Sequence, residues 1–82
     1  MKTRSLTVGN IQHELRARAA DIASQPSGVW SDTVAKQLTY IERACGGDRM
    51  SDQVFDQMHA YGLAQVSAMR SGWLTQEGQN AH

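Results

Sequence analysis

One local pattern recurs three times in this chain, and each copy predicts the start of an α-helix. In each copy an apolar residue stands directly before a Ser or Thr, and a segment with apolar residues at helical spacing follows. A hydroxyl at that position accepts a hydrogen bond from one of the first backbone N–H groups of a helix, which otherwise lack a partner. The three predicted N-caps are Thr7, Ser31 and Ser51, preceded by Leu6, Trp30 and Met50. Three such starts predict three helices.

Turn-forming residues predict where these helices stop. Pro26 disfavours the helical conformation in the residue before it, so the first helix should end near Gln25. Gly46 follows the second segment and can adopt the left-handed conformation that often terminates a helix. The third segment has no strong stop until about residue 77, although Gly62 and Gly72 each weaken it by about 1 kcal/mol relative to Ala. The predicted helices therefore cover about 7–25, 31–45 and 51–77, with flexible tails at 1–5 and 78–82.

Apolar residues recur at the helical period in all three segments, and no segment shows the alternation of a β-strand. The two connections are short, which favours antiparallel packing of consecutive helices. We therefore expect one all-α domain over residues 1–82, a three-helix bundle with a long C-terminal helix. The apolar stripes consist of Val8, Ile11, Leu15, Ala19 and Ile22, then Trp30, Val34, Leu38, Ile41 and Cys45, then Phe55, Met58, Gly62, Val66, Met69 and Trp73.

The third predicted helix is too long for the second to cover. About 15 residues of helix span about 22 Å, whereas about 25 residues span about 37 Å. If the third helix begins beside the end of the second, its last turns carry Met69, Trp73 and Leu74 past that neighbour. Exposed apolar patches usually mark an interface, so these residues are the predicted binding site for a protein partner or for a second copy in a homodimer. Alternatively, the helix kinks or ends near Gly72 and folds Trp73 back onto the bundle.

Acidic residues form one local group in a chain whose eight basic and eight acidic residues balance. Asp48, Asp52 and Asp56 lie at the second turn and along one side of the third helix. Such an acidic ridge would complement the basic surface of a nucleic-acid-handling protein and compete with its ligand. Helix capping and solubility are the alternative explanation for the same three carboxylates. We include the ridge in the predicted partner-binding site.

Basic residues form a second local group near the N-terminus, where Lys2, Arg4, Arg16 and Arg18 could contact a nucleic-acid backbone. The alternative is a solvated face in which Glu14 pairs with Arg18 across one helical turn. The balanced charge of the whole chain does not favour nucleic acid as the partner.

No motif in the sequence carries catalysis, a metal site or a cofactor site. Cys45 is the only cysteine, and we expect it to be a buried apolar residue rather than a nucleophile paired with His59. The Cys and His residues lack the spacing of zinc ligands. We also expect no signal peptide, because the N-terminal residues include no apolar h-region. We expect no membrane-spanning helix, because no apolar run approaches the ~20 residues that a span needs. A lone cysteine suits the reducing cytoplasm, so we expect a cytoplasmic, non-enzymatic protein without metal or cofactor.

Two functions from different classes follow from these features. The first is a small non-enzymatic protein-interaction module that binds another macromolecule and inhibits or regulates it. Small inhibitors carried by phages and mobile elements are of this size and class, and that analogy suggests a host nucleic-acid-targeting defence complex as the target. The alternative is a small dimeric DNA-binding transcriptional regulator that uses the basic N-terminal segment. Salt-dependent binding to duplex DNA would favour the regulator over the protein-binding module.

Overall fold

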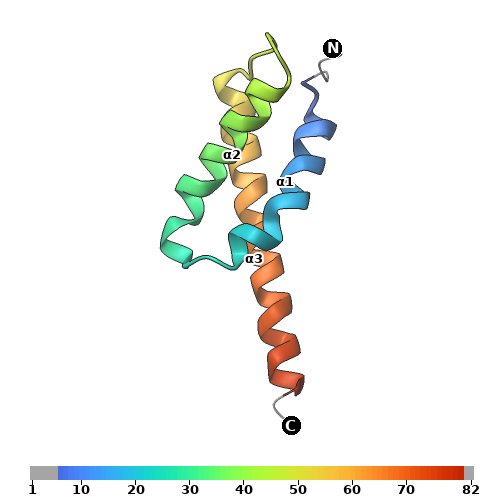
Figure 1. Cartoon of the computed structure of the whole chain (residues 1–82), viewed down its shortest axis with the longest axis vertical. Coiled ribbons are helices and arrows are strands. Elements are labelled where there is room, and N and C mark those ends of the chain that lie inside the picture. The colour runs from blue at the N-terminus through green and yellow to red at the C-terminus, as the bar shows by residue number, and fades with distance from the viewer. Residues whose placement is uncertain (1–5, 81–82) are drawn as a thin grey trace.

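The structure, a computed structural model, describes residues 6–80, with side chains for residues 6–72. The described part of the chain forms α1 (Val8–Ala23), α2 (Trp30–Ala44) and α3 (Asp52–Asn80), with one 3-10 turn, η1 (Ser27–Val29), before α2. Consecutive helices run in opposite directions, and each helix packs against both others (Figure 1). The predicted all-α three-helix bundle is confirmed.

Two of the three predicted N-caps are present. The hydroxyl of Thr7 accepts a hydrogen bond from the backbone N of Asn10 at 3.1 Å, at the start of α1. The hydroxyl of Ser51 accepts one from the backbone N of Val54 at 3.2 Å, at the start of α3. Each bond satisfies one of the N–H groups that the first turn leaves without a helical partner.

The predicted N-cap at Ser31 is wrong. After Pro26 the chain forms η1, which closes with a hydrogen bond from Val29 N to Pro26 O at 3.1 Å and leads directly into α2. The helix therefore already includes Trp30, Ser31 lies inside its first turn, and Val29 caps it without a side-chain hydrogen bond. The Trp30 indole Nε1 donates a hydrogen bond to Gln25 O at 3.0 Å, so the indole stabilises the connection between α1 and α2.

The first two helices end close to the predicted residues. α1 ends at Ala23 rather than near Gln25. α2 ends at Ala44, and Gly46 then adopts a φ of 74°, which is the left-handed conformation predicted for this glycine.

The core lies where the three helices meet, and Gly62 of α3 lies against side chains of both α1 and α2. A Cβ atom at Gly62 would lie 2.7 Å from Val34 Cγ1 and 3.5 Å from Leu15 Cδ2, so a glycine is what allows α3 to sit this close to its neighbours. The predicted stripes supply most of the core, but Val8 is 45% exposed at the start of α1. The buried apolar residues are Ile11, Leu15, Ala19, Ile22, Ala23, Val34, Leu38, Ile41, Cys45, Met50, Met58 and Val66.

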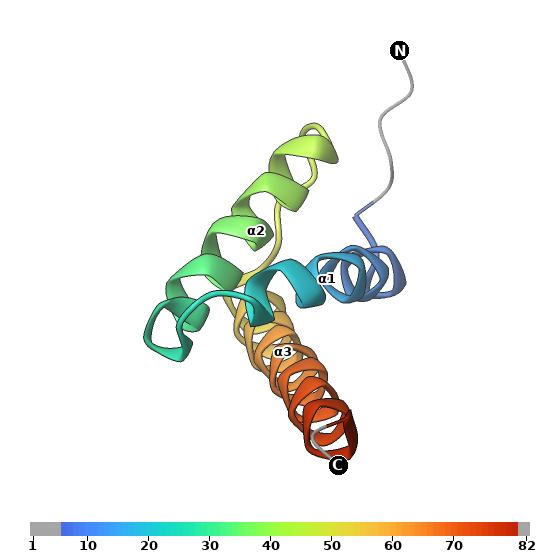
Figure 2. The ribbon, with the colours of Figure 1, turned by 60° about the horizontal axis from the view of Figure 1, so that its bottom comes forward.

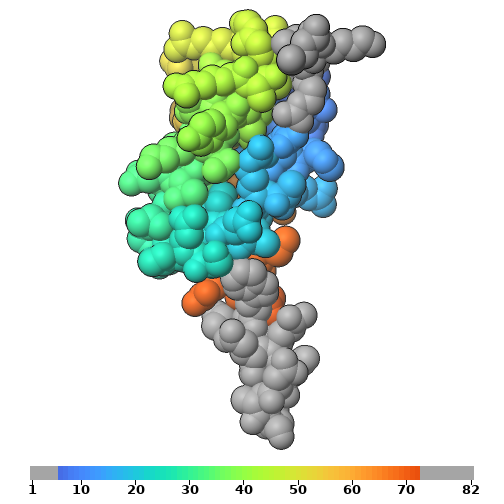
Figure 3. Space-filling model, viewed as in Figure 1, coloured from blue at the N-terminus to red at the C-terminus, as the bar shows by residue number. Residues whose placement is uncertain are grey.

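The end of α3 projects beyond the rest of the bundle. α3 has 29 residues, against 16 in α1 and 15 in α2. It passes Gly72 and continues to Asn80, so it does not end near Gly72 and it exceeds the predicted end at residue 77. Turning the molecule shows that α3 extends past both α1 and α2 (Figure 2), and its orange residues emerge below the α1–α2 connection in the space-filling view (Figure 3).

Candidate functional site

The predicted partner-binding end of α3 is uncovered wherever the structure describes its side chains. Val66 is the last buried residue in that part of the helix, and all side chains from residue 67 to 72 are exposed. Met69 is 40% exposed. Trp73 and Leu74 belong to α3, but their side chains lie outside the described residues. The structure thus presents one of the three predicted apolar residues, Met69, on the projecting segment.

The three residues of the predicted acidic ridge have different surroundings. Asp48 Oδ2 accepts a hydrogen bond from Leu6 N at 3.3 Å, so this carboxylate links the α2–α3 turn to the residue before the α1 cap. Asp52 is exposed in the first turn of α3, where the helix dipole favours a negative charge. Asp56 is also exposed, one turn later on the same helix. Asp48 and Asp52 therefore have local structural roles, which leaves Asp56 as the carboxylate that the fold does not explain.

The predicted basic group is partly engaged within α1. Arg18 Nη1 donates to Glu14 O at 3.0 Å and also pairs with the Glu14 carboxylate, so the expected pairing across one turn is confirmed. Arg16 is exposed to solvent. Lys2 and Arg4 lie outside the described residues. Of the two described members, only Arg16 presents its cation without a carboxylate beside it.

Cys45 and His59 have different surroundings. Cys45 is a free thiol in the core, 3% exposed, and its expected burial is confirmed. His59 Nε2 instead lies 3.0 Å from Ser31 O and 3.2 Å from Ser31 Oγ. The Ser31 carbonyl can only accept a hydrogen bond, whereas the Ser31 hydroxyl can donate or accept one, so either tautomer of the imidazole finds a partner here. His59 therefore connects α3 to the first turn of α2.

Two further properties of the described residues bear on function. Within them, no group of three His, Cys, Asp or Glu side chains is placed to hold a metal ion. None of the helices in this part of the chain combines the length and the hydrophobicity that crossing a membrane needs.

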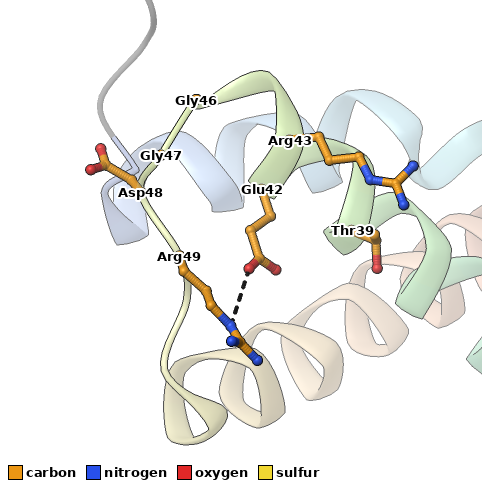
Figure 4. A pocket seen from close by; sticks show the side chains of 7 residues that line it. All are labelled: Thr39, Glu42, Arg43, Gly46, Gly47, Asp48 and Arg49. Carbon is orange, nitrogen blue, oxygen red and sulfur yellow. Dashed lines mark ion pairs between the residues drawn. The ribbon is translucent and has the colours of Figure 1, made fainter.

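The structure also contains a groove that the sequence patterns above do not predict. Two adjoining depressions, with volumes of about 230 Å³ and 240 Å³, share Thr39 and Arg43 on the outer face of α2. One depression lies along α2, and the other continues over the α2–α3 turn (Figure 4). We call the whole surface the α2 groove, and its lining residues are Lys36, Thr39, Tyr40, Glu42, Arg43, Gly46, Gly47, Asp48 and Arg49.

An exposed aromatic ring between two cations characterises the part of the α2 groove that lies along the helix. Lys36, Tyr40 and Arg43 are spaced by four and three residues, which places them on one face of α2. The Tyr40 side chain is 58% exposed. Neither Lys36 nor Arg43 forms an ion pair within the described residues. The spacing of these three residues, on the polar side of the helix, is the feature of the sequence that could have indicated this site.

The acidic residues of the α2 groove have partners of their own. Glu42 lies 3.8 Å from the Nε of Arg49, and Figure 4 shows this pair across the turn, with the Arg43 guanidinium directed away from it. Asp48 is directed away from the Glu42–Arg49 pair and accepts a hydrogen bond from Leu6 N. Within the described residues, no ion pair joins Lys36 or Arg43 to a carboxylate of the groove.

Comparison of the chain with protein-family models, with curated proteins and with solved structures finds no match.

Proposed function

We propose that this chain is a non-enzymatic protein-interaction module that binds another protein through the projecting end of α3, and thereby inhibits or regulates it. The observation that carries the proposal is the excess length of α3, whose side chains are exposed from residue 67 to residue 72 with Met69 among them. A free helical segment of fewer than about 12–15 residues is only marginally stable in water. A partner that covers the segment would therefore stabilise the helix and bury apolar surface at the same time.

The chemistry of Met69 suits such a role. Methionine is flexible and polarisable, so its side chain adapts to irregular apolar surfaces on a partner. Full burial of such a side chain contributes about 1.5–3 kcal/mol, and Met69 is 40% exposed, so a partner gains only part of this from Met69. That is less than a stable complex needs. Trp73 and Leu74 follow within the next turns of α3 and are the residues that we expect to supply the remaining apolar contact.

A second copy of the chain is one such protein partner. A two-fold axis beside α3 would bring the same segment of two copies together and bury it on itself. A homodimer and a complex with a different protein use the same surface, and the oligomeric state of the purified chain distinguishes them.

The finer parts of the proposal concern the cellular compartment and the target. The single buried thiol of Cys45 suits the cytoplasm. That the chain is a phage or mobile-element inhibitor of a host nucleic-acid-targeting complex stays a prediction, based on its size and class. The DNA-binding alternative also stays a prediction, and the pairing of Arg18 with Glu14 leaves it less support than the protein-binding function has.

The proposal is tested by affinity capture from the source cell with matched variants. Met69→Gln replaces an exposed apolar side chain by a polar one of similar length and helix propensity. Val8→Gln makes a comparable change at a position that is 45% exposed on α1. We expect the wild type and Val8→Gln to capture the same partner in similar amounts. Met69→Gln should capture about tenfold less of that partner. Sedimentation at several concentrations identifies the homodimer. If both variants capture and sediment as wild type does, the proposal is wrong.

A further inference from the structure

We propose that the α2 groove binds an acidic segment of a partner protein, in which an apolar or aromatic side chain stands between two carboxylates. This inference is independent of the role proposed for the end of α3. The groove lies on α2 and on the turn from which α3 starts, whereas the projecting segment is at the opposite end of α3 (Figure 1).

The two cations define where carboxylates would bind. Lys36 and Arg43 are seven positions apart on α2, which corresponds to about 10 Å along the helix axis. Both side chains are exposed, and neither forms an ion pair within the described residues. Two carboxylates about this far apart on an extended or helical partner segment would each find one cation. The Arg43 guanidinium can in addition hold a carboxylate by two parallel hydrogen bonds.

Tyr40 supplies the apolar contact between those two charge pairs. Its ring is 58% exposed, more than any other large hydrophobic side chain whose exposure the structure describes. Tyrosine is enriched among the residues that dominate binding at protein interfaces, because it offers a large rigid surface and a hydroxyl at little cost in conformational entropy. An apolar side chain of the partner packed on this ring would fix the register of the two carboxylates.

The charge around the groove favours an acidic protein segment over a nucleic acid. Nucleic-acid affinity arises from the neutralisation of many phosphates by a basic surface, but the chain has no net charge. The end of the groove near the turn is lined by Glu42 and Asp48 as well as Arg49, so a continuous phosphate backbone would meet two carboxylates there. A protein segment can place its carboxylates at Lys36 and Arg43 in the part of the groove that neither Glu42 nor Asp48 lines.

The test starts with selection of a random peptide library on the wild-type chain, followed by titration of the selected peptides by fluorescence anisotropy. We expect enriched peptides with acidic residues on both sides of an apolar or aromatic residue. The double variant Lys36→Glu/Arg43→Glu should bind them at least about tenfold more weakly, because it removes two favourable charge pairs and adds repulsion. Tyr40→Ala should weaken binding about tenfold. All three side chains are exposed, so the variants should keep the circular dichroism spectrum of the wild type.

The matched control is Arg16→Glu, which reverses an exposed cation on α1 and should leave peptide affinity within about twofold of wild type. The proposal is overturned if no selected peptide is sensitive to the groove variants, or if Arg16→Glu weakens binding as much as they do. It is also overturned if a single-stranded oligonucleotide binds the groove more tightly than the peptides at the same salt concentration. Self-association that the groove variants abolish would identify a second copy as the occupant, and would overturn it too.

Discussion

Replacement of Gly62 by alanine tests the packing on which the whole arrangement of α3 depends. The new Cβ would lie 2.7 Å from Val34 Cγ1, whereas ordinary van der Waals contacts begin at 3.4 Å, so one of the two must move by about 0.7 Å. Val34 has little freedom to do so, because it is completely buried and a valine in a helix has one dominant rotamer. The helices α2 and α3 must therefore separate.

The expected magnitude follows from two opposing contributions. Overpacking of a well-packed core costs about 1–3 kcal/mol, and the higher helix propensity of alanine offsets about 1 kcal/mol of that. We expect Gly62→Ala to lower the free energy of unfolding by about 1 kcal/mol, and the melting temperature by about 4–8 °C in a domain of this size. Gly72→Ala is the control, because a Cβ there meets nothing within 4 Å, and its melting temperature should equal or slightly exceed that of wild type.

Thermal and urea denaturation followed by circular dichroism measure both variants. The double variant Gly62→Ala/Val34→Ala adds a test of mechanism, since removal of Cγ1 removes the close contact. The two substitutions should destabilise by about 1 kcal/mol less together than the sum of their separate effects. If Gly62→Ala stabilises the protein as Gly72→Ala does, then α3 does not pack against α2 in the way described.

Three further predictions concern the caps and the thiol. Gly46→Ala should lower the free energy of unfolding by about 1–2 kcal/mol, because alanine is strained at a φ of 74°, whereas Gly47→Ala should have little effect in the same urea titrations. Thr7→Ala should cost about 1 kcal/mol through the lost hydrogen bond from Asn10 N, and a Thr7→Ser variant should retain most of the stability. Cys45, at 3% exposure, should react with a thiol reagent only as fast as the protein unfolds; rapid reaction in native buffer would contradict its place in the core.

The local rules of helix formation predicted most of the fold. Thr7 and Ser51 cap their helices because their hydroxyls accept hydrogen bonds from N–H groups of the first turn. This interaction is local, so it depends on no other part of the chain. The N-cap predicted at Ser31 is wrong because η1 leads directly into α2, so the helix begins before this residue. The hydroxyl and the carbonyl of Ser31 contact His59 of α3 instead. That contact joins residues far apart in sequence, and no local rule contains it.

The candidate surfaces were predictable only in part. The excess length of α3 followed from the helix boundaries, and Met69 is exposed as that length implies. The α2 groove was missed, although the spacing of Lys36, Tyr40 and Arg43 was visible in the sequence. An exposed cation indicates a binding site only when no carboxylate of the same chain pairs with it. The sequence does not show which carboxylates pair with which cations, because the pairing of Glu42 with Arg49 arises only in the folded turn.

Hydrogen exchange of the α3 amides in the free monomer tests the central claim most directly. At a concentration where the chain sediments as a monomer, residues 58–66 should exchange slowly, because the bundle covers them. Residues 67–80 should exchange at least about a hundredfold faster, because an unsupported helical segment of this length opens readily. Addition of a captured partner should then slow exchange in 67–80. Equal protection of 58–66 and 67–80 in the monomer would show that the chain covers the end of α3 itself, and would contradict the account.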